Sequence, residues 1–184
     1  MTRVVTFRHT APARWVEVPA HALGAVRPGP PDLHALGAVR TGPPDLHCLV
    51  QRGSAPEMRL DLYAAPGAQL YVYHQALEIG DLLAVGFGHE VHLVPPWPGA
   101  PRTITLRSYF VSLHRSTDAL YIASGEDITR VDADGGVRWT SPQIAADGVR
   151  VEIITDDEIA GEADEDPPGG WYPFRLDARD GTPC

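Results

Sequence analysis

The sequence predicts an all-β protein, an antiparallel β-sandwich or distorted barrel of about ten short strands with a Pro-rich loop at 19–46. Apolar and polar residues alternate with a period of two in several short runs, as in half-buried strands. Glycine and proline, 18 of each among 184 residues, leave few stretches in which a helix is stable. No window of about a dozen residues keeps a helical period.

The alternating runs mark the expected strands in chain order. They are MRLDLY (58–63), QLYVYH (69–74), HEVHLV (89–94), TITLRSYFVSLH (103–114) and VRVEI (149–153). In the fourth run the apolar positions change face, so we expect a β-bulge or bend near Ser108. Turn sequences separate the runs at 65–67, 134–136, 147–148 and 167–170.

A tandem duplication occupies 21–46. HALGAVRPGPPDL (21–33) is followed directly by HALGAVRTGPPDL (34–46), and the copies differ only at Pro28 and Thr41. The unit is shorter than solenoid repeats, which run to roughly 20–50 residues. We therefore expect an exposed loop, because long surface insertions cost little loop-closure entropy. The alternative is a ligand-binding arm that presents His21, His34 and His47 at equal spacing.

The length suits a single β-rich domain over 1–184, with a possible subdivision by charge. Residues 1–115 hold ten arginines against eight acids and all eight histidines, whereas residues 116–184 hold five arginines against sixteen acids. The first part is near-neutral and His-rich, and the second is acidic. We expect no nucleic-acid partner, because binding a phosphate backbone requires excess positive charge.

Cellular location and origin also have sequence signals. Arg3, Arg8, His9 and Arg14 interrupt the apolar residues near the N-terminus, and no stretch is long and apolar enough to cross a membrane. Only Cys48 and Cys184 are present, which excludes a disulfide scaffold and a four-cysteine zinc site. We expect a cytoplasmic protein without a membrane partner. All 15 basic residues are arginine, which indicates GC-rich coding DNA and a bacterial origin.

One segment carries a resemblance to a known family. LYIASGEDITRVDADGGVRWTS (120–141) resembles a blade segment of quinoprotein-type β-propellers, with Asp132, the Asp-Gly-Gly turn at 134–136 and a strand ending in Trp139. It covers about 22 of 184 residues, whereas a propeller has typically four to eight blades. The resemblance implies local strand–turn–strand geometry. It implies no cofactor or active site, because no functional residue of that family is matched.

The acidic second part supplies the candidate partner-binding residues. A basic protein partner would meet carboxylates and two aromatic rings of the Trp171 loop. The candidates are Asp156, Asp157, Glu158, Glu162, Asp164, Glu165, Asp166, Trp171 and Tyr172. The alternatives are a solvated acidic edge, a Ca²⁺ site whose spacing departs from the EF-hand loop, and aromatic rings that close the core.

Histidines supply a second candidate site. His74, His89 and His114 lie on apolar-patterned runs and would ligate a metal if the fold brought them together. His89 and His92 point to opposite faces of a strand, so they do not share a metal without a bulge. Hydrogen-bonded or solvated histidines are the alternative.

No nucleophile elbow, phosphate loop or complete dinucleotide fingerprint is present, so the sequence favours a protein that is not an enzyme and has no cofactor. We expect a non-catalytic, protein-binding β domain, such as an inhibitor or immunity-type protein for a basic partner. The alternative is a small-ligand or metal-dependent β-barrel enzyme that uses the three histidines.

Overall fold

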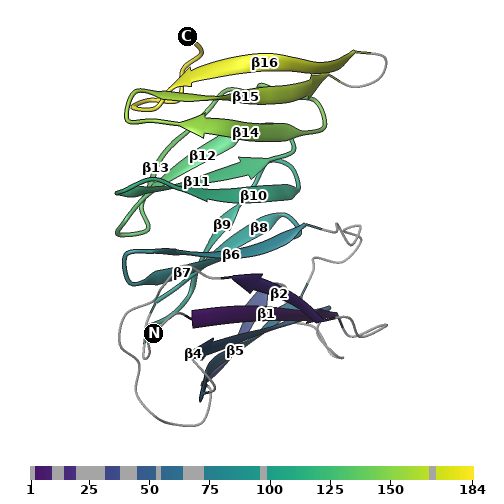
Figure 1. Ribbon diagram of the computed structural model, residues 1–184, viewed down its shortest axis with the longest axis vertical. Coiled ribbons are helices and arrows are strands. Elements are labelled where there is room, and N and C mark those ends of the chain that lie inside the picture. The colour runs from purple at the N-terminus through teal and green to yellow at the C-terminus, as the bar shows by residue number, and fades with distance from the viewer. Residues whose placement is uncertain are drawn as a thin grey trace.

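Four β-sheets stacked in chain order make up the molecule, as a computed structural model shows (Figure 1). The structure describes residues 3–9, 15–19, 32–37, 45–52, 55–63, 73–95, 99–165 and 169–184. These residues form sixteen strands and no helix, and so no helix of the length and hydropathy that a membrane span needs. The all-β prediction is confirmed, with more strands than the ten or so expected.

Sheet 1 contains five strands in the order β2-β1-β4-β5-β3. They are β1 (Arg3–His9), β2 (Trp15–Pro19), β3 (Asp32–Gly37), β4 (Leu46–Arg52) and β5 (Ala55–Tyr63). Every neighbouring pair is antiparallel except β3 and β5, which are parallel. The run predicted at 58–63 lies within β5.

The expectation of a continuous loop over 19–46 is wrong at residues 32–37, because these residues form β3. Prolines stand at positions 28, 30, 31, 43 and 44, and the stretch between the two groups has none. Residues 32–37 lie in that stretch. Because none of them is a proline, every one has a backbone N–H that can bond within the sheet. Residues 20–31 and 38–44 of the expected loop lie outside the described residues.

Sheets 2, 3 and 4 are simple antiparallel meanders, in which each strand pairs with the next along the chain. Sheet 2 contains β6 (His74–Ile79), β7 (Leu82–Phe87), β8 (Glu90–Val94) and β9 (Arg102–Thr105). Sheet 3 contains β10 (Phe110–Arg115), β11 (Ala119–Ser124), β12 (Ile128–Asp132) and β13 (Val137–Thr140). Sheet 4 contains β14 (Val149–Ile154), β15 (Glu158–Glu165) and β16 (Gly170–Asp177).

Two predicted segments have particular places in these meanders. Residues 120–141, compared above with a propeller blade, form β11, β12 and β13. The predicted bent strand at 103–114 is instead two strands, β9 and β10, in different sheets. The change of apolar face near Ser108 therefore marks the point where the chain leaves sheet 2 for sheet 3. Of the run predicted at 69–74, residues 69–72 lie outside the described residues and His74 begins β6.

Three apolar layers hold the four sheets together, one between each pair of neighbours. Phe7, Leu60 and Val85 belong to the layer between sheets 1 and 2. Phe110 and Leu93 belong to the layer between sheets 2 and 3, and sheets 3 and 4 enclose the third layer. Each sheet in the middle of the stack is buried on both faces, which explains the unbroken apolar run of β11, where all six residues are buried.

The stack has two ends at which the turns of sheets 2 to 4 gather. We call one the Trp171 end, and it carries residues 73, 88–89, 106–109, 125–127, 141–148, 165 and 169–171. Backbone hydrogen bonds join these turns from sheet to sheet, among them Phe110 N to Gly88 O, Gly125 N to Tyr109 O and Ala146 N to Asp164 O. We call the other the Arg130 end, and it carries residues 80–81, 116–118, 133–136, 155–157 and 178–181.

Candidate functional site

The three candidate metal ligands do not meet. The His74 ring lies 4.7 Å from the Phe7 ring, centroid to centroid, in the layer between sheets 1 and 2. His114 lies opposite Tyr121, whose ring packs in the layer between sheets 3 and 4. Paired residues of an antiparallel sheet share a face, so His74 and His114 occupy layers separated by two sheets. These imidazoles are too far apart to share a metal ion.

His114 and His89 each lie in their own local surroundings. His114 is bonded through Nε2 to the Ser112 hydroxyl at 2.8 Å, and burial lowers the pKa of its imidazole. His89 lies in the turn between β7 and β8. The described residues contain no group of three His, Cys, Asp or Glu side chains placed to hold a metal ion. No observation in this part of the chain favours the metal-dependent alternative.

The candidate partner-binding residues divide between the two ends of sheet 4. Asp156 and Asp157 form the turn before β15 at the Arg130 end, whereas Glu165 ends β15 at the Trp171 end. An extended strand rises about 3.3 Å per residue, so Glu158 and Glu165 lie roughly 23 Å apart. Asp166 lies outside the described residues.

Two of the predicted carboxylates are neutralised within the fold. Glu162 accepts a hydrogen bond from Arg150 Nη1 at 2.7 Å, and Glu158 forms an ion pair with Arg175 at 3.0 Å. Tyr172 also departs from the prediction, because it packs in the apolar layer between sheets 3 and 4 and donates its hydroxyl to Ile144 O. The eight candidates that the structure describes therefore do not form one surface.

A row of aromatic side chains crosses the Trp171 end. Tyr73 and Tyr109 are stacked with ring centroids 6.3 Å apart, and the Tyr109 hydroxyl donates to Asp147 O at 2.5 Å. The Trp171 ring lies against the backbone of Gly148, where a Cβ atom would come within 3.1 Å of it. Tyr73 and Trp171 are 47% and 46% exposed, which is unusual for rings of this size.

Several carboxylates near this row of aromatic rings form no ion pair with an arginine of the described chain. Those with no ion pair in the described part of the chain are Glu126, Asp147, Asp164 and Glu165. The two arginines of sheets 2 to 4 at this end are already engaged, since Arg107 pairs with Asp127 at 3.3 Å and Arg150 pairs with Glu162. The Trp171 end therefore carries an excess of negative charge beside exposed aromatic rings.

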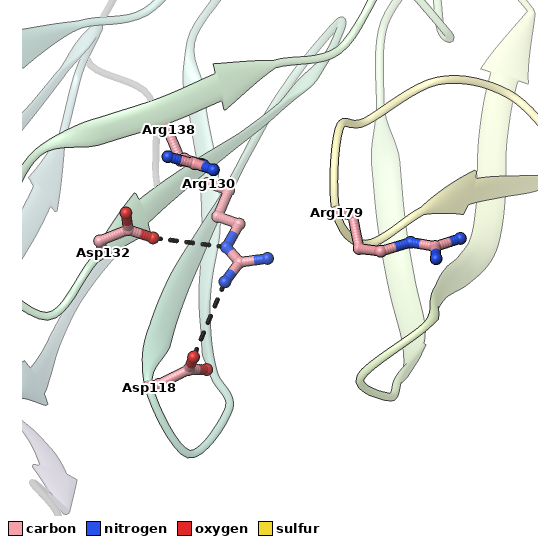
Figure 2. A pocket seen from close by; sticks show the side chains of 5 residues that line it. All are labelled: Asp118, Arg130, Asp132, Arg138 and Arg179. Atoms are coloured by element: carbon pink, nitrogen blue, oxygen red, sulfur yellow. Dashed lines mark ion pairs between the residues drawn. The ribbon is translucent and has the colours of Figure 1, made fainter.

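An arginine-lined cleft opens at the Arg130 end, where no site was predicted. It has a volume of about 450 Å³ and is lined by Asp118, Arg130, Asp132, Arg138 and Arg179 (Figure 2). Three of the five arginines in residues 116–184 contribute to it. The spacing of these three arginines in the sequence matches no motif, because β12, β13 and the turn after β16 come together only in the folded chain.

Arg130 is held firmly in this cleft. Its Nη1 donates to Ala178 O at 2.8 Å, its Cζ lies 5.9 Å from the Tyr121 ring centroid, and its side chain is 17% exposed. Trp139 Nε1 donates to the same carbonyl at 3.3 Å. These bonds fix the C-terminal turn on sheet 3, so that Arg179 comes to line the cleft.

Arg138 reaches the cleft through a β-bulge. Arg130 pairs with Trp139 and Val131 pairs with Val137, so Arg138 is an additional residue of β13 without an opposite partner. A bulge changes the direction in which a side chain leaves the strand. Arg138 consequently lies beside Arg130 instead of on the opposite face of the sheet, as Figure 2 shows.

Comparisons with protein-family models, curated proteins and solved structures found no match for this chain. The geometry of the two ends therefore carries the functional argument.

Proposed function

We propose that this chain is a non-catalytic, cytosolic, bacterial β domain that binds a basic protein through its Trp171 end. The observation that carries the proposal is the row of exposed aromatic rings flanked by four carboxylates without ion pairs in the described chain. An inhibitor or immunity-type role toward a basic toxin or nuclease suits such a surface.

Aromatic and acidic groups contribute differently to such binding. Tryptophan and tyrosine bury a large apolar area at little entropic cost, so they recur as the residues that dominate interface energies. Unpaired carboxylates around them attract a basic partner and accelerate its encounter. Because both kinds of group lie on one rigid surface, we expect affinity from Trp171 and salt-sensitive association from the acids.

Arg150 supports the position of Trp171. The Arg150 Cζ lies 4.5 Å from the Trp171 ring centroid, and Glu162 holds the guanidinium from the side. A cation over an indole face limits the motion of the ring. Trp171 is thus partly ordered before a partner arrives, which lowers the entropy lost on binding.

The division of the acidic residues between two ends provides a matched control. Asp164→Ser with Glu165→Ser removes two charges from the Trp171 end, and Asp156→Ser with Asp157→Ser removes two from the Arg130 end. Both double variants change the net charge equally, and all four side chains lie at or near the surface.

The experiment is affinity capture from a lysate of the source organism with wild-type protein, both double variants and Trp171→Ala. We expect one basic protein that is retained at about 0.05 M salt and released by about 0.5 M salt. Trp171→Ala and the Asp164/Glu165 variant should lose it, whereas the Asp156/Asp157 variant should retain it. Equal behaviour of the two double variants, or retention by Trp171→Ala, would contradict the proposed surface.

A further inference from the structure

The cleft at the Arg130 end is large enough for a small ligand and is separate from the surface proposed above. Its volume of about 450 Å³ is within the range of pockets that hold small molecules, roughly 300–1,000 Å³. Three guanidinium groups and two carboxylates line it. In a protein with a net charge of −9, the gathering of three arginines around one cleft is a distinctive feature.

Arg130 retains hydrogen-bonding capacity although two carboxylates flank it. Asp132 Oδ1 is 3.6 Å from its Nε and Asp118 Oδ2 is 3.8 Å from its Nη2, and both distances exceed a hydrogen bond. The buried Nε has no hydrogen-bond partner. Asp118 is 76% exposed and can move away at little cost, because exposed ion pairs contribute little free energy. The Nη2 side of this fixed guanidinium is therefore open to a competing acceptor.

Arg138 supplies the second donor. The part of the chain that the structure describes contains no ion pair to this exposed guanidinium, although sixteen acids lie in residues 116–184. The bulge in β13 directs it to the same cleft as Arg130. Guanidinium groups bind carboxylate and phosphate oxygens in a planar, bidentate geometry.

Arg179 completes the positive side of the cleft, but its charge is already balanced. Its Nε and Nη2 bond both oxygens of Asp177, at 3.0 and 2.6 Å, and these bonds lower the pKa of Asp177 to about 2. Arg130 and Arg138 are therefore the two groups available to a ligand.

We propose that this cleft binds an oxyanion, a carboxylate or phosphate group, bridged between Arg130 Nη2 and the Arg138 guanidinium. Asp118 is then a competitor of the ligand, and its removal should strengthen binding.

The test uses two of the four indole N–H groups, those of Trp139 and Trp171, as reporters in nitrogen–proton NMR spectra. Trp139 Nε1 shares the Ala178 carbonyl with Arg130, whereas Trp171 lies at the opposite end of the stack. Titration with inorganic phosphate or succinate at constant ionic strength should move the Trp139 signal saturably and leave Trp171 in place. The two titrations distinguish a phosphate site from a carboxylate site, and saturation by either supports the proposal.

Three variants give the decisive comparison. Arg138→Gln should weaken binding about tenfold, which is the loss expected for one charged hydrogen bond. Asp118→Asn should strengthen binding several-fold. Arg175→Gln, which removes the same charge from a residue paired with Glu158 on sheet 4, should leave binding unchanged.

The proposal is overturned by any of three results in these spectra. They are the absence of a saturable Trp139 shift with both anions, an equal loss of affinity in Arg138→Gln and Arg175→Gln, or weaker binding by Asp118→Asn. The Trp171 signal confirms in each variant that the stack remains folded.

Discussion

Gly86 of β7 lies directly against the ring of Phe110, the first residue of β10 in the next sheet, so that a Cβ atom at position 86 would overlap that ring. Phe110 is fully buried, and its ring occupies the space that a side chain on β7 would otherwise fill. The contact joins sheets 2 and 3 close to the Trp171 end. The absence of a side chain at Gly86 therefore allows sheets 2 and 3 to approach each other at this point.

Gly86→Ala should consequently destabilise the fold by about 1–3 kcal/mol, the usual cost of an additional carbon in a packed core. Chemical denaturation followed by tryptophan fluorescence measures the change. In a Phe110→Leu background the added methyl group has room, so the same substitution should cost much less. Equal costs in both backgrounds would show that Phe110 does not limit the space at Gly86.

His92 should make stability depend on pH. Its side chain is 1% exposed, and burial lowers the pKa of its imidazole from 6.5 to about 4, although Glu90 Oε2 lies 3.5 Å from Nε2. The unfolded chain binds the proton near pH 6.5 and the folded chain only near pH 4. The contribution of His92 is therefore complete above pH 6.5, and about 3 kcal/mol is lost as the pH falls to 4.

Free energies of unfolding measured between pH 7 and pH 4 check this prediction, with His92→Gln as the comparison. Carboxylates and His114 titrate in both proteins, so the difference between the two curves isolates His92. We expect a shallower slope for the variant. Parallel curves would mean that His92 is not kept neutral by the fold.

The two cysteines should differ sharply in reactivity. Cys48 is fully buried in the layer between sheets 1 and 2, and burial raises the pKa of its thiol, whereas Cys184 is exposed. A thiol reagent should modify only Cys184 in the native protein, because the thiolate is the reactive form. Colorimetric thiol counting with and without denaturant measures this, and native Cys184→Ser should be unreactive. Rapid modification of that variant would contradict the burial of Cys48.

Deletion of residues 21–33, the first repeat copy, should change the melting temperature by only a few degrees. The deletion removes Asp32 and Leu33 and leaves Ala20 alone to join β2 to the rest of β3 at the opposite edge of sheet 1, so β3 is lost, but it is only an edge strand and residues 34–45 can still connect β2 to β4. Deletion of both copies, 21–46, also removes Leu46, the fully buried first residue of β4, and should lower the melting temperature clearly more. Thermal unfolding of the two variants measures these changes. If the repeat were structural, the single deletion would already abolish cooperative unfolding, and the duplication would not be a tolerated insertion.

Local alternation predicted individual strands well and their assignment to sheets poorly. The runs at 58–63 and 149–153 fall in β5 and β14, and the run at 89–94 falls in β8 apart from His89 in the turn before it, because a period of two follows directly from the pleat of a strand. The run at 103–114 was predicted as one bent strand because a change of face looks alike at a bulge and at a crossing between sheets. Only the partners of β9 and β10 separate these cases.

The candidate site shows the same division. Residues 156–165 are neighbours in sequence, but β15 extends them along the whole length of sheet 4 and places them at opposite ends. The sequence also did not show which of these carboxylates form ion pairs, because Arg150 and Arg175 reach Glu162 and Glu158 from neighbouring strands. The cleft of Arg130, Arg138 and Arg179 had no sequence signal, since a bulge and a C-terminal turn create it.

The sequence by itself determined that this chain forms strands and turns and that residues 116–184 carry an excess of acids, because backbone sterics and composition act locally. Tertiary structure decided which histidines are separated, which carboxylates remain unpaired and where arginines gather. Those outcomes depend on contacts between residues distant along the chain, which strand pairing and sheet stacking alone establish.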